Sequence, residues 1–126
     1  MNQINAAEHL QLLAIAATAA ATVTAVSTGV DVTSFVGKGA IVLSSAAGTG
    51  TTPTLDVKLQ ESDTLGGTYT DVAGGAFTQV TGAPGLQKLA IDLDAAKAFL
   101  RISETLTGTT PSFARGVSLL GFKQNR

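Results

Sequence analysis

The stretch "VKLQESDTLGGTYTDV", residues 57–72, carries the pattern that decides the fold. Apolar and polar residues alternate as far as Glu61, the pair Gly66-Gly67 interrupts the alternation, and an extended segment follows. Alternation with a period of two is typical of a half-buried strand, and glycines in a turn supply positive φ. The stretch therefore predicts a β-hairpin.

Three carboxylates crowd this turn, at Glu61, Asp63 and Asp71. Clustered oxygens would suit a calcium ion, but the DxDxDG-type spacing of a calcium loop is absent. Ser62 and Asp63 are residues that stabilise turns through side-chain bonds to the backbone. The turn is the favoured interpretation, and calcium binding stays open as an alternative. A pair of glycosidase carboxylates would need a cleft between them, which nothing in the sequence indicates.

Further short extended segments follow one another along the chain, separated by turn residues. They are expected at 22–28, 30–35, 40–46, 54–62, 68–72, 76–80, 86–93, 99–106 and 112–122. Gly37 and Gly39 are expected to bracket a turn, 46–53 and 107–111 to be loops, and 94–98 to form one helical turn.

No long helical pattern separates these segments, which argues against parallel βαβ folds. In the clearest strand, Leu55, Val57 and Leu59 face one way. We therefore predict an all-β fold of about eight strands, arranged as a sandwich or a barrel.

Residues 1–21 are Ala-rich and fit a helix or a strand equally well. We expect them to form an N-terminal arm or extension, with the sandwich domain at 22–126. Ordering ~20 residues costs roughly 30 kcal/mol, so the arm is expected to dock on its own sandwich or on a neighbour. No Lys or Arg precedes Lys38, which argues against a signal peptide.

The composition restricts the function classes. The chain has 126 residues, of which 44% are hydrophobic and only 13% charged, a low charge content that favours a surface covered by partners. The net charge is −1 and no basic run occurs, which argues against nucleic-acid binding. Without cysteine, thiolate chemistry is excluded, and one histidine, His9, is too few for the usual zinc site. We expect no enzyme activity, no catalytic, cofactor or metal residues, no cofactor and no membrane contact.

Two arginines and two aromatic residues invite a functional interpretation. Arg101 and Arg115 are expected on outer faces of strands, paired with Glu104 or Asp92 or facing an acidic patch of a partner, with pairing within the sheet slightly favoured. Tyr69 and Phe99 offer thin support for a sugar-binding platform, because aromatic residues are scarce in this chain.

Three stretches of the sequence are "LDVKLQESDTLGGTYTDVAGGAFTQV" (55–80), "KAFLRISETLTGTTPSFARGVSLLGFKQ" (97–124) and "STGVDVTSFVGKGAIVLSSAAGTGTTPTLDVKLQES" (27–62). All three resemble small head decoration or cement proteins of tailed bacteriophages. The resemblance covers about residues 27 to 124 and includes no catalytic motif.

The resemblance implies an antiparallel jelly-roll-like β-sandwich. It also implies a structural virion protein on the capsid exterior, made in the host cytoplasm. It would join neighbouring subunits, with the major capsid protein and other copies of itself, as a homo-oligomer, for partners. The alternative is a binding module of a phage tail or adhesin that recognises glycans or a host surface.

Overall fold

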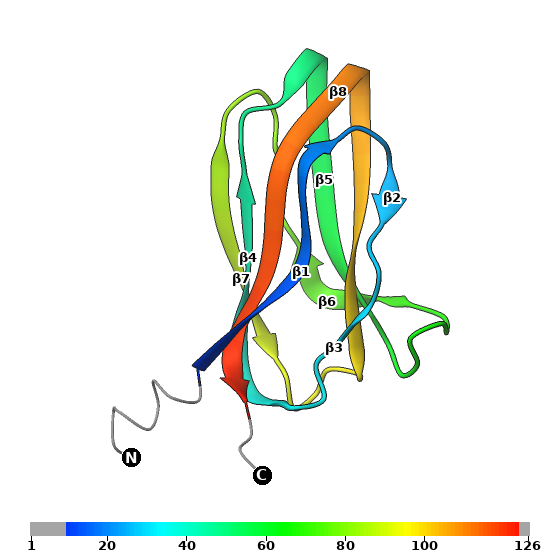
Figure 1. The fold of residues 1–126 in the computed structure, drawn as a ribbon, viewed down its shortest axis with the longest axis vertical. Helices are drawn as coiled ribbons and strands as arrows, with labels where there is room; N and C mark the ends of the chain where they lie inside the picture. Colours follow the sequence, from blue (N-terminus) through cyan, green and yellow to red (C-terminus); the bar gives the residue numbers. More distant parts are fainter. Residues whose placement is uncertain (1–9, 124–126) are drawn as a thin grey trace.

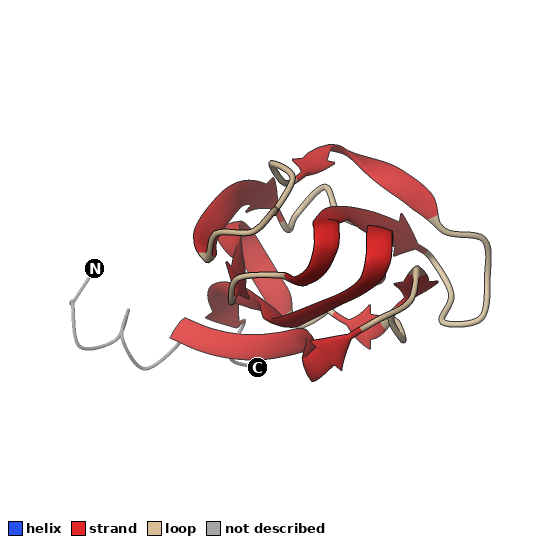
Figure 2. Cartoon of the chain, turned by 90° about the horizontal axis from the view of Figure 1, so that it is seen from above, coloured by secondary structure: helices blue, strands red, loops and turns tan. Residues whose placement is uncertain are grey.

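The computed structural model describes residues 10–123, and every regular element in that range is a β-strand (Figures 1 and 2). All strand pairings are antiparallel. The predicted all-β, jelly-roll-like class is therefore confirmed. In chain order the strands are β1 (Leu10–Ala21), β2 (Ala25–Val26), β3 (Val30–Asp31), β4 (Phe35–Ser45), β5 (Thr49–Ser62), β6 (Thr70–Ala76), β7 (Gly85–Asp92) and β8 (Phe99–Lys123).

Strand β8 belongs to both layers of the sandwich. Its first part pairs with β5, with the short strands β2 and β3 on its other side, and β6 lies beyond β5. Its second part pairs with β4 on one side and β1 on the other, and β7 lies beyond β4. Figure 1 shows β8 rising, bending over the top of the molecule and descending beside β1. The two strands expected at 99–106 and 112–122 are thus one strand, and 107–111 is its corner.

Glycine is required where β5 accompanies β8 around this corner. Gly50 and Gly108 have φ of +107° and +114°. A Cβ at Gly50 would lie 2.5 Å from the carbonyl oxygen of Thr110, and one at Gly108 would lie 2.7 Å from that of Thr52. The two backbones lie close together here, and most of the segment expected to be a loop, 46–53, belongs to strand β5.

The core lies between the two layers and consists of inward side chains from most strands. Leu55, Val57 and Leu59 of β5 are 0–2% exposed, as their alternation predicts. They pack with Leu100 and Ile102 of β8. Most of the remaining core comes from the following residues: Phe35, Ile41, Leu43, Phe77, Val80, Ile91, Leu93, Phe113, Val117 and Leu119.

Two expected turns are wrong in detail. Gly37 and Gly39 lie within β4, where a register shift between Val36 and Ala40 forms a bulge, so they bracket no turn. The β5–β6 hairpin forms as predicted, but Gly66 and Gly67 are not among the glycines with positive φ.

Two further segments are shorter than expected. In the 94–98 segment, Asp94 and Ala95 lie in a turn that the hydrogen bond from the Ala96 N–H to the Asp92 carbonyl closes, and no helix forms. In the 76–80 segment, Val80 forms an isolated bridge with Leu55 and is not part of a longer strand.

The expected arm is a strand of the sandwich over the residues described. Residues 10–21 form β1, which pairs with β8, and Ile15 and Ala21 are 6% exposed. The boundary expected at residue 22 therefore does not separate 10–21 from the sandwich, because the core needs their inward side chains. Residues 1–9, including His9, lie outside the described part. No helix in residues 10–123 is long and apolar enough to cross a membrane.

Candidate interaction surface

Large apolar side chains gather on the outer side of the sheet that contains β1. Leu10 and Leu12 of β1 are 41% and 69% exposed, and Leu120 and Phe122 of β8 are each 37% exposed. The register places Leu10 opposite Phe122 and Leu12 opposite Leu120. These four side chains therefore form two adjacent cross-strand pairs rather than scattered single residues.

Strand β4 extends the patch on the other side of β8. Val36 lies opposite Phe122, Ala40 opposite Leu120 and Val42 opposite Ser118. All three are half-buried and share the outward side of the sheet. We call this surface the apolar face and define it by Leu10, Leu12, Val36, Ala40, Val42, Leu120 and Phe122. Contiguous apolar surface of this kind marks interaction sites in soluble proteins.

Strand β1 also forms an open edge of this sheet. In the described part of the chain it pairs with β8 alone. Its sequence, LQLLAIAATAAA, contains neither a charge nor a proline, although such residues usually protect an edge from pairing with other chains. Two register shifts interrupt the edge, between Ala14 and Ala16 and between Thr18 and Ala21. The edge thus continues the apolar face as a surface suited to contact with another polypeptide.

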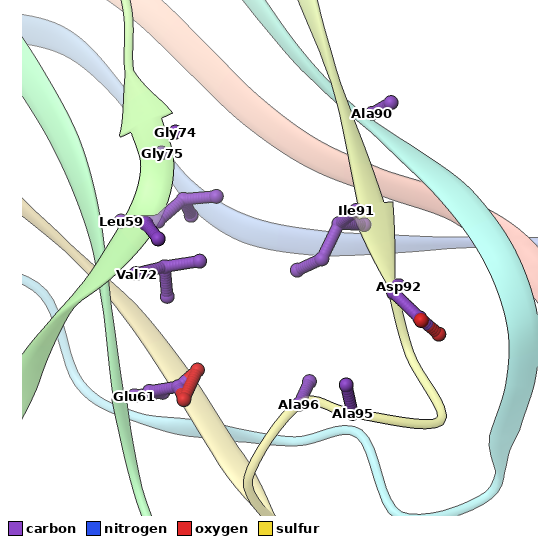
Figure 3. Close-up of a pocket in the computed structure, with 11 residues that line it drawn as sticks. Leu59, Glu61, Val72, Gly74, Gly75, Ala90, Ile91, Asp92, Ala95 and Ala96 are labelled. Carbon is purple, nitrogen blue, oxygen red and sulfur yellow. The ribbon is translucent and has the colours of Figure 1, made fainter.

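A pocket of about 250 Å³ lies between the edge strands β6 and β7 (Figure 3). The lining residues are Leu59, Glu61, Val72, Ala73, Gly74, Gly75, Ala90, Ile91, Asp92, Ala95 and Ala96. The β6 side is built by a bulge, since Lys58 pairs with Ala76 but Gln60 pairs with Asp71. The bulged residues of β6, 72–75, line the pocket.

The three carboxylates of the hairpin do not converge. Asp71 accepts bonds from Gln60 Nε2 at 3.0 Å and Lys58 Nζ at 2.9 Å, which together hold its pKa below the usual 3.8. Asp63 lies 4.0 Å from Lys97, and Glu61 lines the pocket. Within residues 10–123, no group of three or more acidic or histidine side chains is placed to hold a metal ion.

Ser62 performs the turn role that the sequence predicts. Its hydroxyl accepts from the Thr64 N–H at 3.2 Å and donates to the Thr64 carbonyl at 2.8 Å. Ser62 is 2% exposed, so these bonds also satisfy a buried hydroxyl.

Arg115 pairs with Glu104, but in the interior rather than on an outer face. Arg115 Nε and Nη2 donate to the two carboxylate oxygens at 2.8 and 2.7 Å, and both side chains are at most 7% exposed. The two residues come from opposite parts of β8, so the ion pair connects the two layers. Arg115 Nη1 is buried and has no hydrogen-bond partner among residues 10–123.

Arg101 makes neither of the expected ion pairs. Its Nε donates to Gln60 Oε1 at 2.9 Å, and its guanidinium lies 4.0 Å from the centroid of the Tyr69 ring. The Tyr69 hydroxyl donates to the Leu65 carbonyl at 2.9 Å. One ring face and the hydroxyl of Tyr69 are therefore already engaged. Phe99 is half-buried in the β5–β8 ladder.

The apolar face was not predicted from the sequence. The alternation in "SFARGVSLLGF" places Leu120 and Phe122 on the side opposite to Val117 and Leu119, which was the available signal. Leu10 and Leu12 carried no such signal, because residues 1–21 fitted a helix and a strand equally well.

No family model matches the sequence. No curated protein matches it either. Solved structures share its fold. The SPBc2 prophage-derived protein YomS matches with a TM-score of 0.50 and 11% identity, over 87% of this chain and 92% of YomS. A protein of the infectious bursal disease virus T13 particle matches with a TM-score of 0.50 and 13% identity, over 90% of this chain and 31% of the viral chain. The fold is thus found in a prophage-derived protein and in a virus particle.

Proposed function

We propose that this protein is a structural virion protein that binds the exterior of a tailed-phage capsid and stabilises it by bridging neighbouring subunits. Its partners are the major capsid protein and other copies of itself, and it catalyses no reaction. The observation that carries the proposal is the apolar face with the open β1 edge beside it. The likeness of three sequence stretches to phage decoration proteins supports it, as does a fold that a virus particle also uses.

The mechanism is the burial of apolar area at seams between capsid subunits. A specific interface typically buries ~1,600 Å² in total, and apolar burial contributes about 25 cal/mol per Å². The apolar face presents its side chains on a rigid sheet, so little conformational entropy is lost when it docks. Many copies on one shell would add these contributions over the whole particle.

Substitution within the apolar face tests the proposal directly. Leu12→Glu places a charge at a position that is 69% exposed, so it changes the surface without removing a core side chain. Leu65→Glu is the matched control, since Leu65 is 52% exposed in the β5–β6 loop. We expect L12E to lower binding to purified particles at least tenfold, or ~1.4 kcal/mol, measured by co-sedimentation.

Particles carrying the wild-type protein or L65E should survive heating better than bare particles, and particles mixed with L12E should not. Equal binding of L12E and L65E would contradict the role of the apolar face. Equal survival of bare and decorated particles would contradict stabilisation.

A further inference from the structure

The pocket between β6 and β7 has the size of a single side chain. Its volume is about 250 Å³, whereas pockets for drug-sized ligands usually measure ~300–1,000 Å³. No aromatic residue lines it, so it offers no platform on which a sugar ring would stack. The size and the lining favour one long, flexible side chain over a glycan or a nucleotide.

The walls are apolar where the stem of such a side chain would lie. Leu59 and Val72 lie on one side, and Ile91 and Ala96 lie on the other (Figure 3). Gly75 lets β6 lie close to Leu59 of β5, because a Cβ there would lie 3.1 Å from the Leu59 Cβ. Long aliphatic stems are stabilised against surfaces of this type while the polar head contacts a polar partner.

Glu61 supplies a negative charge at one end of the pocket. Figure 3 shows its carboxylate directed into the space between Val72 and Ala96, and no hydrogen bond or ion pair engages it within the described residues. The other lining carboxylate, Asp92, is paired with Lys38 at 2.9 Å. No Lys, Arg or His lines the pocket. The charge of the site therefore suits a cation.

Both strands that flank the pocket have a free edge. Among the described strands, β6 pairs only with β5, and β7 pairs only with β4. An extended peptide can pair with such an edge through its backbone and place alternate side chains into an adjoining pocket. We propose that the pocket binds a lysine or arginine side chain presented by an extended segment of a partner polypeptide, with Glu61 as its counter-ion. This assignment does not depend on the virion role.

The test uses the full chain and a blocked pentapeptide with a central lysine flanked by valine and threonine. Its binding is followed by the amide chemical shifts of the protein. We expect saturable shifts at the amides of Glu61, Val72, Gly74 and Ala96. Replacing the lysine of the peptide by norleucine should weaken binding about tenfold, because a charge-assisted bond of roughly 1.4 kcal/mol is lost. n-Butylammonium chloride alone should shift the same amides more weakly.

Variants of the protein complete the test. Glu61→Gln should weaken the peptide about tenfold, and Ala96→Leu should block the pocket. Asp63→Asn is the matched control, since it removes the same charge two residues away and outside the pocket. D63N should bind as the wild type does, and amide spectra that retain wild-type dispersion would show that each variant is folded.

Several results would overturn the proposal. They are equal binding of the lysine and norleucine peptides, equal weakening by E61Q and D63N, shifts confined to other surfaces, or no saturable shift by about 20 mM peptide. Pocket amides that move when residues 124–126 are deleted would assign the pocket to the chain's own C-terminus, which includes Arg126. Pocket amides that move on dilution would assign it to a second copy.

Discussion

At the scale of single residues, Glu104 and Arg115 form an ion pair that is buried in the core. Each side chain is at most 7% exposed, and they bind through two hydrogen bonds across the layers. Breaking such a pair leaves a buried charge without a partner, whereas replacing both residues by apolar ones of similar volume is often neutral or stabilising. We therefore expect the pair to disfavour arrangements of the two parts of β8 that leave either charge unpaired.

Glu104→Gln should lower the free energy of unfolding by about 3 kcal/mol, because the guanidinium loses its counter-charge. The double substitution Glu104→Leu with Arg115→Met should recover most of that loss. Urea denaturation measures both, and Glu61→Gln serves as the control on β5 because its carboxylate is half-buried at the pocket. A loss no larger in E104Q than in E61Q would show that the buried pair does not stabilise the fold.

The contacts of Asp71 predict how its carboxyl group titrates. Hydrogen bonds from Gln60, which has the larger effect, and from Lys58 lower its pKa in the folded state below the usual 3.8. A lowered pKa contributes stability that is present above the unfolded-state value and is lost as the pH falls through the folded-state value. Carboxyl carbon shifts should therefore show Asp71 titrating below 3.8 in the wild type, and Gln60→Met should raise its pKa toward that value. An unshifted wild-type titration would contradict these contacts.

The sequence contains part of this residue-scale information. Alternation through Leu100 and Ile102 places Glu104 on the inward side, but propensity assigns a glutamate to the surface. The inward position of Arg115 follows in the same way from Val117 and Leu119. What the sequence lacks is the corner that brings the two parts of β8 together, since the pairing partner is set by the tertiary structure.

At the scale of elements, the hairpin over 57–72 was predictable because its period of two and its turn residues are local signals. The length of β8 was not, because Thr, Gly and Pro at 107–111 are typical of a loop. The paired glycines, Gly50 and Gly108, allow two strands to turn the corner together, and this depends on residues far apart in the sequence. The same reason explains β1, whose Ala-rich sequence has little preference until β8 pairs with it.

Deletion of residues 1–21 should destabilise the sandwich strongly. The deletion removes β1 and the core side chain of Ile15, and it uncovers the β8 edge next to Val117 and Leu119. Loss of a buried isoleucine side chain alone typically costs about 2–5 kcal/mol. Deletion of residues 1–9 is the control, because it keeps β1. Denaturant midpoints compare the two, and equal midpoints would show that β1 is a dispensable arm.

At the scale of the whole molecule, the outer side of the β7-β4-β8-β1 sheet differs from an ordinary solvent-facing surface. Its exposed leucines and phenylalanine form rows across neighbouring strands, and the β1 edge beside them has no protecting charge. The low charge content of the sequence favours a surface covered by partners, which stays a prediction. It does not place that surface on the fold, because the placement requires the register of strands from opposite ends of the chain. The absence of a catalytic motif was readable from the sequence and remains part of the proposal.

A three-dimensional reconstruction of the native particle, with density clear enough to orient this sandwich, tests the central claim most directly. We expect the protein to lie on the outside of the shell with Leu12, Leu120 and Phe122 buried against a subunit. Density in which these three side chains face solvent, or particles that lack the protein, would contradict it.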